Sequence, residues 1–337
     1  MEKACVFGAG AWGTALAQYL TTIGKQVKLV VREAERDLVN IINKKLENTD
    51  YLPDIPLSEN IRATCDPEEG VADARIIMFV VPTPFLRSFS RNIHRLLPKG
   101  VPIVNCSKGI ENESLQTGVE ILKEELPGKY HNFLAVLSGP NFAREISKGL
   151  PANTTIAAEN ADNASLVQDI LSSKLFRCYT SDDVIGVETG GALKNVIAIA
   201  GGAADGLGLG ESARAGLITR GLAEMTRLAV RRGGNPLTLS GLSGVGDLVL
   251  TCSSSLSRNR TLGFELGQGR SFKEMMSSRK TVAEGYKTSK SVYQCTKLYD
   301  VDMSISTEVY RVLYEDKPLA DALNTLLTRP IKPEITT

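Results

Sequence analysis

The sequence predicts an α/β fold in which a doubly wound, mostly parallel sheet is followed by an all-α region. Short apolar runs alternate with helical patterns over the first half of the chain, which is typical of strands joined by crossover helices. From residue 184 onward the patterns are helical, with glycine-rich joints. With 337 residues, the chain is also too long for one typical core. We therefore predict a sheet domain at 1–183, a helical domain at 184–330 and a flexible tail at 331–337.

Each predicted strand is a short, nearly continuous apolar run, as expected for parallel strands that are buried on both faces. The predicted strands are 3–7, 26–31, 74–82, 101–109, 133–140, 153–159 and 175–181. Helical spacing of apolar residues predicts the connecting helices at 11–22, 85–97 and 114–126. The helices predicted after the sheet are 184–204, 211–232, 238–250, 259–267, 271–277 and 284–297.

The composition excludes several classes of function. The 39 Lys and Arg residues balance the 38 Asp and Glu residues, so no global field favours nucleic acid or an anionic membrane. Two histidines offer little for a histidine-rich metal site, and we predict no metal. The six cysteines form no CxxC motif, as in a reducing compartment. Since we find neither a membrane-spanning apolar stretch nor a signal peptide, we expect a cytoplasmic protein without membrane insertion.

The stretch GAGAWG places Gly8, Gly10 and Gly13 in a G-x-G-x-x-G motif between the first predicted strand and the first predicted helix. In that context the first glycine permits a tight turn and the second lets backbone approach a pyrophosphate. The third lets the helix pack closely on the sheet, and the helix N-terminus supplies N–H donors. The sequence therefore predicts a dinucleotide site in a Rossmann-type domain.

The end of the second predicted strand leaves the choice of dinucleotide open. An NAD site commonly has an acidic residue there to hold the ribose hydroxyl groups. Here Arg32 occupies the turn and Glu33 follows it. Arg32 suits the extra phosphate of NADP, or it is an exposed loop charge, whereas Glu33 suits NAD. We therefore predict NAD or NADP.

The segment GGALKNVIAIAGG, residues 190–202, places Lys194 in an apolar, helical pattern. Buried lysines are rare unless they are paired or used in catalysis. A helical side chain leans toward the residues three and four positions earlier, which here are Gly191 and Gly190. We predict that these glycines leave room for a substrate beside the ammonium group. The alternative is that they allow close helix packing while Lys194 reaches solvent.

Other polar residues stand near predicted strand ends and helix starts. Lys108 follows a strand at the edge of the sheet where ligands of doubly wound folds bind. Asp247 lies in a glycine-rich apolar run, either as a site residue or as a helix N-cap. The SRNR segment at 257–260 offers donors for a phosphate, or is a polar helix cap.

Together these segments resemble the bacterial-type NAD(P)-dependent glycerol-3-phosphate dehydrogenase family over about residues 3–327. The segments that carry the resemblance, in order, are GAGAWGTALA, CSKGIE, SGPNFA, GGALKNVIAI, ITRGLAEM, GVGDLVLTC, SRNR and EGY. The resemblance implies reversible reduction of dihydroxyacetone phosphate to sn-glycerol 3-phosphate, a precursor of glycerophospholipids, by a homodimer of two-domain subunits.

Carried over position by position, the resemblance makes Lys194 the proton acceptor in glycerol 3-phosphate oxidation. The residues that would line the substrate site with it are Lys108, Gly139, Asn141, Asp247, Ser257, Arg258 and Asn259. The residues that would contact the dinucleotide beside the glycine turn are Ala11, Trp12, Arg32, Lys108, Ala143, Arg258, Val282 and Glu284. The family often has Ser or Asn at position 11 and Ser or Thr at position 141, so the polar roles of those positions are in doubt here.

The chemistry agrees with this assignment. Oxidising an alcohol requires a base for its proton, and a buried lysine with a lowered pKa serves as base and, in reverse, as acid. As the other two catalytic residues, Lys108 would polarise the substrate carbonyl group and Asp247 would orient Lys194. Lys108 would lower the pKa of Lys194 and Asp247 would raise it, so the net value stays open. Two alternatives remain: a related hydroxyacid dehydrogenase, and a protein that binds NAD(P) without catalysis.

Overall fold

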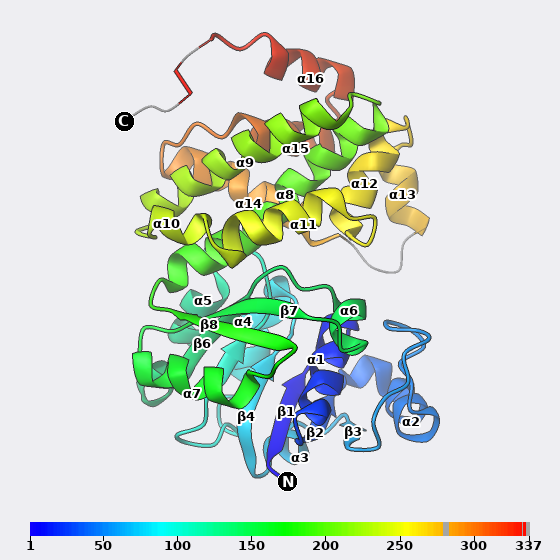
Figure 1. Ribbon diagram of the computed structural model, residues 1–337, viewed down its shortest axis with the longest axis vertical. Helices are drawn as coiled ribbons and strands as arrows, with labels where there is room; N and C mark the ends of the chain where they lie inside the picture. Colours follow the sequence, from blue (N-terminus) through cyan, green and yellow to red (C-terminus); the bar gives the residue numbers. More distant parts are fainter. Residues whose placement is uncertain (279–282, 332, 335–337) are drawn as a thin grey trace.

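The computed structural model of the protein describes residues 1–278, 283–331 and 333–334. In this part of the chain, one sheet has the strand order β3-β2-β1-β4-β5-β6-β7-β8 (Figure 1). Its strands are β1 (Lys3–Phe7), β2 (Gln26–Val30), β3 (Ile61–Thr64), β4 (Ala74–Phe79), β5 (Ile103–Asn105), β6 (Leu134–Ser138), β7 (Ala152–Ala157) and β8 (Phe176–Ser181). Neighbouring strands are parallel except β6 and β7, which are antiparallel. The strand order reverses between β1 and β4, which is where doubly wound sheets bind ligands.

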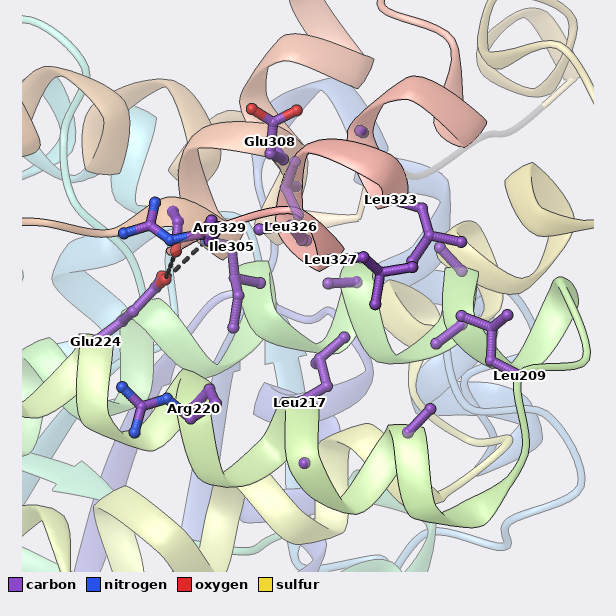
Figure 2. A pocket seen from close by; sticks show the side chains of 18 of the residues that line it. Leu209, Leu217, Arg220, Glu224, Ile305, Glu308, Leu323, Leu326, Leu327 and Arg329 are labelled. Atoms are coloured by element: carbon purple, nitrogen blue, oxygen red, sulfur yellow. Dashed lines mark hydrogen bonds between the residues drawn. The ribbon is translucent and has the colours of Figure 1, made fainter. Parts of the chain in front are cut away.

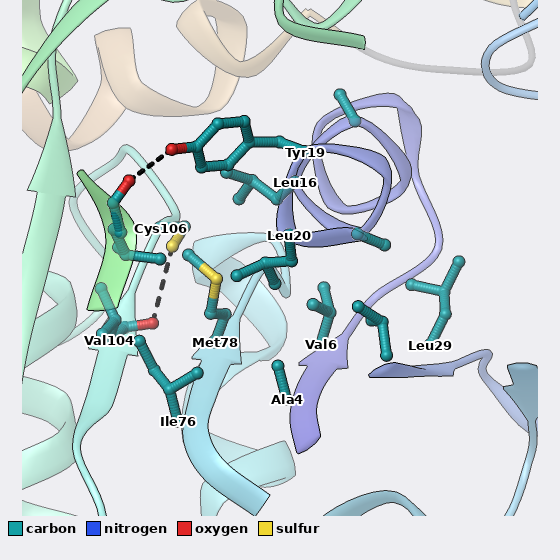
Figure 3. Close-up of a cluster of buried hydrophobic side chains, with 14 of the residues drawn as sticks. Ala4, Val6, Leu16, Tyr19, Leu20, Leu29, Ile76, Met78, Val104 and Cys106 are labelled. Carbon is teal, nitrogen blue, oxygen red and sulfur yellow. Dashed lines mark hydrogen bonds between the residues drawn. The ribbon is translucent and has the colours of Figure 1, made fainter. Parts of the chain in front are cut away.

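The sheet is buried on both faces because helices cover each of them. The elements of this region are α1 (Ala11–Thr22), η1 (Glu33–Glu35), α2 (Arg36–Lys45), α3 (Pro67–Val71), α4 (Thr83–Ile93), α5 (Gly118–Glu125), η2 (Gly128–Phe133), α6 (Ala143–Ser147) and α7 (Ala161–Leu171). Val6 of β1 packs with Leu16 and Leu20 of α1 on one face (Figure 3). Its neighbour Phe7 points to the other face and meets Phe79 edge-on. This alternation explains why the strands read as continuous apolar runs.

After β8 the described chain is helical. The helices are α8 (Val184–Gly206), α9 (Glu211–Arg231), α10 (Pro236–Leu239), the π-helix η3 (Leu242–Gly246), α11 (Asp247–Ser253), α12 (Arg258–Gly267), α13 (Phe272–Ser278), α14 (Glu284–Leu298), α15 (Ser304–Tyr314) and α16 (Leu319–Leu327). They form the upper half of Figure 1, around the buried α8. A Cβ on Gly202 of α8 would lie 1.9 Å from the Arg260 carbonyl oxygen, so this glycine lets α12 approach closely.

Helix α8 also corrects one expectation from the sequence. This helix of 23 residues contains an apolar window with a mean hydropathy of 1.2 and is long and apolar enough to cross a membrane, although we predicted no such stretch. In the structure, 89% of the apolar window is buried among the other elements. Packing inside the protein therefore accounts for its apolar character, as in the core helix of many folds.

The predicted fold class is confirmed, and several elements differ from the prediction. Seven strands were predicted correctly in position, whereas β3 was missed. The single helix predicted at 238–250 is α10, η3 and α11 in succession. Helices α2, α3, α6, α7, α15 and α16 were also not predicted. The division of the chain after residue 183 stays a prediction; β8 ends at Ser181 and α8 begins at Val184.

Candidate active site between the sheet and the helices

Lys194 lies in the middle of α8 with 8% of its surface exposed, so it does not reach solvent as a surface lysine would. Its Nζ donates to Oδ1 of Asp247 at 2.5 Å and to the Thr251 hydroxyl at 3.0 Å. Both partners belong to α11, where they are four residues apart and therefore share one face of the helix. Lys194 is a paired, buried cation.

Asp247 connects Lys194 to the sheet. Its second carboxylate oxygen, Oδ2, accepts from Lys108 Nζ at 2.6 Å. Lys108 follows β5 and also donates to the Gly139 carbonyl oxygen, just after β6, at 3.0 Å. The structure thus brings together Lys108, Gly139, Lys194 and Asp247, which the sequence analysis assigned to one substrate site.

The charges of this group shift the pKa values of its members. Burial lowers the pKa of Lys194 to about 8; Asp247 opposes this shift and Lys108 adds to it. Burial raises the pKa of Asp247, but Lys108 and Lys194 outweigh this effect, and its pKa is lower than usual. At neutral pH the site holds two cations around one buried carboxylate. A proton on Lys194 is therefore easier to remove than one on an exposed lysine.

The two glycines before Lys194 have a different role from the one we predicted. A Cβ on Gly190 would lie 2.6 Å from the Ser243 carbonyl oxygen. A Cβ on Gly191 would lie 2.7 Å from the Ser138 hydroxyl oxygen. The glycines therefore let η3 and β6 pack against α8, as in the packing alternative. The second part of that alternative is wrong, because Lys194 is buried.

The π-helix η3 places Asp247 at the first position of α11. The residue in the N-cap position is Gly246, so Asp247 does not cap this helix. A π-turn widens the helix and changes the direction in which the following side chains point, and such turns are frequent at functional sites. Asp247 thereby faces the two lysines.

The glycine turn fits a dinucleotide. Gly8 has φ +107°, and a Cβ there would lie 2.5 Å from the Val80 carbonyl oxygen of the strand beyond the order reversal. A Cβ on Gly13 would lie 1.8 Å from the Gly8 carbonyl oxygen. A Cβ on Gly10 would meet no described atom within 4 Å, so its backbone is open to a ligand. The turn has the close-packed and the open glycines that a pyrophosphate cradle requires.

The first turn of α1 leaves donors unused. Its N-cap is Gly10, which supplies no side-chain cap. The indole nitrogen of Trp12 is buried and has no hydrogen-bond partner among the described residues. Ala11 is the first residue of α1, and Ala143 is the first residue of α6, which packs against α1.

Arg32 and Glu33 remain as the sequence analysis described them, in the turn after β2. Arg32 donates to Glu35 at 2.6 Å, and Glu33 accepts from both Arg36 Nε and Arg36 Nη2. Both are exposed. Each has a local partner on the protein surface, and the choice between NAD and NADP stays open.

The SRNR segment adjoins the lysine site through an amide pair. Asn259 Nδ2 donates to Oδ1 of Asn195, the residue after Lys194, at 2.8 Å. Asn259 Oδ1 accepts from the backbone N–H of Gly285, beside Glu284, at 2.9 Å. The Ser257 hydroxyl accepts from the Arg260 backbone N–H and so caps the N-terminus of α12. For this residue the structure agrees with the alternative that SRNR is a polar helix cap.

The remaining predicted residues have different surroundings. Arg258 is exposed at the start of α12. Asn141 donates to the Asn153 carbonyl oxygen at 3.0 Å, and its Oδ1 is buried without a partner among the described residues. Glu284 is half-buried, and its charge opposes the lowering of the Lys194 pKa. Val282 lies outside the described residues.

Three residues near Lys194 were not predicted from the sequence. Thr251 contacts Lys194 directly, and its position four residues after Asp247 was the available signal. Asn195 stands beside Lys194 in the sequence but was given no role. Glu188 is buried in α8, where a charged residue in an apolar helix was the signal. No group of three or more potential metal ligands is found among the described residues.

A cavity of about 660 Å³ lies elsewhere, between the end of α8 and helices α9, α15 and α16. Figure 2 shows its apolar lining, including Leu217 and Leu326, with Glu224 at one side. The described residues that line it do not include Lys194 or Asp247. The cavity is therefore separate from the candidate active site.

Comparison with known proteins identifies the family. A family model described as NAD-dependent glycerol-3-phosphate dehydrogenase N-terminus matches residues 3–164, and the corresponding C-terminus model matches residues 183–324. The chain belongs to the NAD-dependent glycerol-3-phosphate dehydrogenase family. This membership confirms the predicted family, the dehydrogenase class and the NAD(P) cofactor.

Individual relatives match nearly the whole chain. The NAD(P)+ glycerol-3-phosphate dehydrogenase of Myxococcus xanthus is 48% identical over 99% of both chains. That of Leptospira biflexa is 46% identical over 98% of this chain and 99% of its own. The crystal structure of glycerol-3-phosphate dehydrogenase from Coxiella burnetii superposes with a TM-score of 0.91 at 36% identity, covering 97% of this chain and 99% of its own.

Proposed function

We propose that this dehydrogenase catalyses the reversible reduction of dihydroxyacetone phosphate to sn-glycerol 3-phosphate with NADH or NADPH. The observation that carries the proposal is the buried Lys194–Asp247–Lys108 group, with the pKa of Lys194 lowered to about 8. The names of the relatives support the substrate, since those proteins are called glycerol-3-phosphate dehydrogenases.

Lys194 is the proposed acid and base. In oxidation, its neutral amine accepts the proton of the substrate hydroxyl group at C2; in reduction, its ammonium group donates a proton to the carbonyl oxygen. A group whose pKa lies near the working pH serves both directions, because both protonation states are populated. When bound, the nicotinamide supplies or accepts the hydride. Asp247 holds Lys194 in place and limits how far its pKa falls.

Lys108 is the proposed second donor to the substrate oxygen. Its ammonium group donates to Oδ2 of Asp247 and that of Lys194 donates to Oδ1, so the two lysines bind the same carboxylate. In such a pair one ammonium group stabilises the developing alkoxide while the other transfers the proton. Gly139 and Asn141 complete the proposed substrate site on the sheet side.

Arg258 and Asn259 are the proposed anchors of the substrate phosphate. The guanidinium group of Arg258 is exposed. The amide of Asn259 is buried and gives one N–H to Asn195, which leaves its second N–H for a phosphate oxygen. Ser257, as the cap of α12, fixes the first turn that carries both residues. The proposed dinucleotide contacts are the glycine turn with the residues Ala11, Trp12, Arg32, Lys108, Ala143, Arg258, Val282 and Glu284.

We infer that the protein is a cytoplasmic homodimer whose product feeds glycerophospholipid synthesis, with a dinucleotide-binding domain at 1–183 and a substrate domain at 184–330. The resemblance of the motifs to the family supports these points.

The test is an oxidation assay of NADH and NADPH with dihydroxyacetone phosphate, run beside unphosphorylated dihydroxyacetone and a set of 2-oxo acids. We expect turnover with the phosphorylated ketone alone. Turnover with 2-oxo acids instead would indicate a hydroxyacid dehydrogenase, and cofactor binding without turnover would indicate a binding protein. Lys194→Ala is expected to keep dinucleotide affinity and to lose at least a thousandfold in kcat, in the range seen when an acid–base group is removed.

A further inference from the structure

Glu188 lies in α8, six residues before Lys194, and is 6% exposed. Its Oε1 accepts from Asn105 Nδ2 at 2.9 Å and from the backbone N–H of Val119, in the first turn of α5, at 3.0 Å. The Val119 N–H also lies 3.2 Å from Oε2. A carboxylate from the helical region is thus buried against the end of β5 and the start of α5.

Asn105 in turn binds the backbone of Ser107, the residue before Lys108. Its Oδ1 accepts from the Ser107 backbone N–H at 3.2 Å, and its Nδ2 donates to the Ser107 carbonyl oxygen at 3.3 Å. The amide therefore binds both backbone groups of Ser107. Since Lys108 follows directly, the position of its backbone depends on where Asn105 is held.

The two lysines are consequently connected to α8 twice. The side chain of Lys108 reaches α8 through Asp247 and Lys194. Its backbone reaches α8 through Asn105 and Glu188. This closed chain of contacts fixes the separation between the Lys108 and Lys194 ammonium groups, and each ammonium group influences the pKa of the other by a distance-dependent interaction.

We infer that Glu188 and Asn105 are positioning residues that set Lys108 against Lys194, without contacting the substrate themselves. The inference rests on the proposed role of Lys194 as acid and base. Glu188 does not touch either lysine, so its effect passes through the Ser107 backbone. This effect requires the hydrogen bond in which the Asn105 amide donates to the Glu188 carboxylate.

The charged surroundings of Glu188 fit this role. Burial raises its pKa to about 7, while hydrogen bonds from Thr117 and Asn105 and from the Val119 backbone lower it. Glu120 of α5 is the nearby acid that adds to the raised pKa, and it is paired with Arg232 at 2.6 Å. Removing the Asn105 donor therefore takes away one of the hydrogen bonds that stabilise the buried, charged form of Glu188.

The test exchanges donor and acceptor. Asn105→Asp removes the amide donor and places a second carboxyl group against Glu188. In the alkaline range of the profile, where the two acids hold no shared proton, the two carboxylates repel each other, which releases Ser107. We expect kcat/KM to fall about tenfold, less than the roughly hundredfold that a misplacement of about 1 Å can cause. The apparent pKa of the pH–rate profile should move as well, because Lys108 no longer stands at its original distance from Lys194. Dinucleotide affinity should stay within about twofold, since the glycine turn belongs to β1 and α1.

Adding Glu188→Gln to Asn105→Asp restores one donor and one acceptor. The glutamine amide can donate to the carboxylate introduced at position 105, while its oxygen accepts from the Val119 N–H. We expect the double variant to recover kcat/KM to within about threefold of the wild type and to regain its pH profile. Wild-type kinetics in Asn105→Asp, or no recovery in a folded double variant, overturns the inference.

Glu224→Gln is the matched control. Glu224 is a second buried carboxylate of the helical region, which accepts from the backbone N–H of Ile305 at 2.7 Å (Figure 2). It also accepts from the backbone N–H of Ser306 at 3.1 Å. It has no contact with the lysine site, so its loss should lower the melting temperature and leave the pH–rate profile unchanged. An equal shift of the profile in Glu224→Gln means that general destabilisation explains the effect, and overturns the inference.

Two further arms keep the outcomes separate. Should Asn105→Asp melt below the assay temperature, Asn105→Ala removes the donor without adding charge and is expected to shift the profile in the same direction. The wild type and Lys194→Ala are assayed in the same series. An inactive wild type, or an active Lys194→Ala, refutes the proposed function, whereas an active wild type that needs Lys194 but not Asn105 refutes only this inference.

Discussion

Lys108 and Lys194 bind opposite oxygens of one buried carboxylate, at 2.6 and 2.5 Å from Oδ2 and Oδ1 of Asp247. One comes from the end of a sheet strand and the other from the middle of a core helix, so the pair exists only after the sheet and the helices have packed. Two cations around one anion leave an excess positive charge in a buried place. Burial lowers the pKa of Lys194 to about 8; Asp247 opposes this shift, and the charge of Lys108 adds to it.

The pH dependence of the two reaction directions follows from that value. Oxidation needs neutral Lys194, so its kcat should rise with pH through about 8 and then level off. Reduction needs the ammonium form, so its kcat should be level below about 8 and fall above it. Steady-state kinetics in both directions over the same pH range measures this.

Lys108→Met supplies the control for that assignment. Removing the neighbouring cation takes away an interaction that lowers the pKa of Lys194, so the oxidation profile should move to higher pH. An unmoved midpoint would show that a group other than Lys194 titrates. The total activity of this variant should also fall, because the proposed second donor to the substrate oxygen is lost.

Two glycines of the dinucleotide turn should separate stability from affinity. Gly13→Ala forces a Cβ to within 1.8 Å of the Gly8 carbonyl oxygen, so we expect a loss of about 1–3 kcal/mol in unfolding free energy. Gly10→Ala meets no described atom within 4 Å and should leave the melting temperature nearly unchanged. The added methyl group should nonetheless weaken NADH binding at least tenfold, because the backbone no longer reaches the pyrophosphate.

Thermal melting and NADH titration of both variants check this. If Gly10→Ala binds NADH as tightly as the wild type does, the pyrophosphate does not lie over this glycine.

The sequence predicted the sheet well because its strands are buried on both faces and read as apolar runs. It failed at β3, where only four residues, IRAT, pair with β2 and an arginine interrupts the run. It also failed to divide 238–250, because periodicity alone does not reveal that Gly244 packs against the Leu239 carbonyl oxygen, where a Cβ would lie at 2.0 Å. Close backbone contacts between neighbouring turns depend on tertiary structure.

For the site, the sequence pointed to the residues but not to their partners. Lys194 was conspicuous as a charge in an apolar helix, and the structure pairs it with Asp247, 53 positions further on. Lys194, Asp247 and Lys108 meet only because α8, α11 and the end of β5 pack together. These elements are far apart in the sequence, so no local sequence pattern reveals the contact. Glu188 was overlooked for the same reason: its role depends on Asn105, 83 positions earlier in the chain.

Arg32 should affect the two dinucleotides unequally. Its guanidinium group is exposed beside Glu35 in the turn after β2, where the ribose of the dinucleotide would lie. Arg32→Ala should weaken NADPH binding about tenfold or more and change NADH binding by less than about threefold, since an arginine suits a phosphate and not a hydroxyl group. Titration of the variant with both dinucleotides checks this, and equal losses for both would mean that Arg32 does not distinguish them.

Arg258 and Arg260, two residues apart at the start of α12, should separate substrate binding from stability. Arg260 donates from Nε and Nη2 to Asp205 at 3.0 and 2.6 Å, so Arg260→Ala should lower the unfolding free energy by about 1–3 kcal/mol. Arg258 is exposed, and Arg258→Ala should change stability by less than about 0.5 kcal/mol. As the proposed phosphate anchor, its loss should raise the KM for dihydroxyacetone phosphate about tenfold to a hundredfold, the equivalent of a charged hydrogen bond. At a temperature where Arg260→Ala stays folded, that variant should keep the wild-type KM for dihydroxyacetone phosphate, because Arg260 is paired with Asp205 and is not the proposed phosphate anchor. An unchanged KM for the phosphorylated ketone in Arg258→Ala would move the phosphate site away from the start of α12.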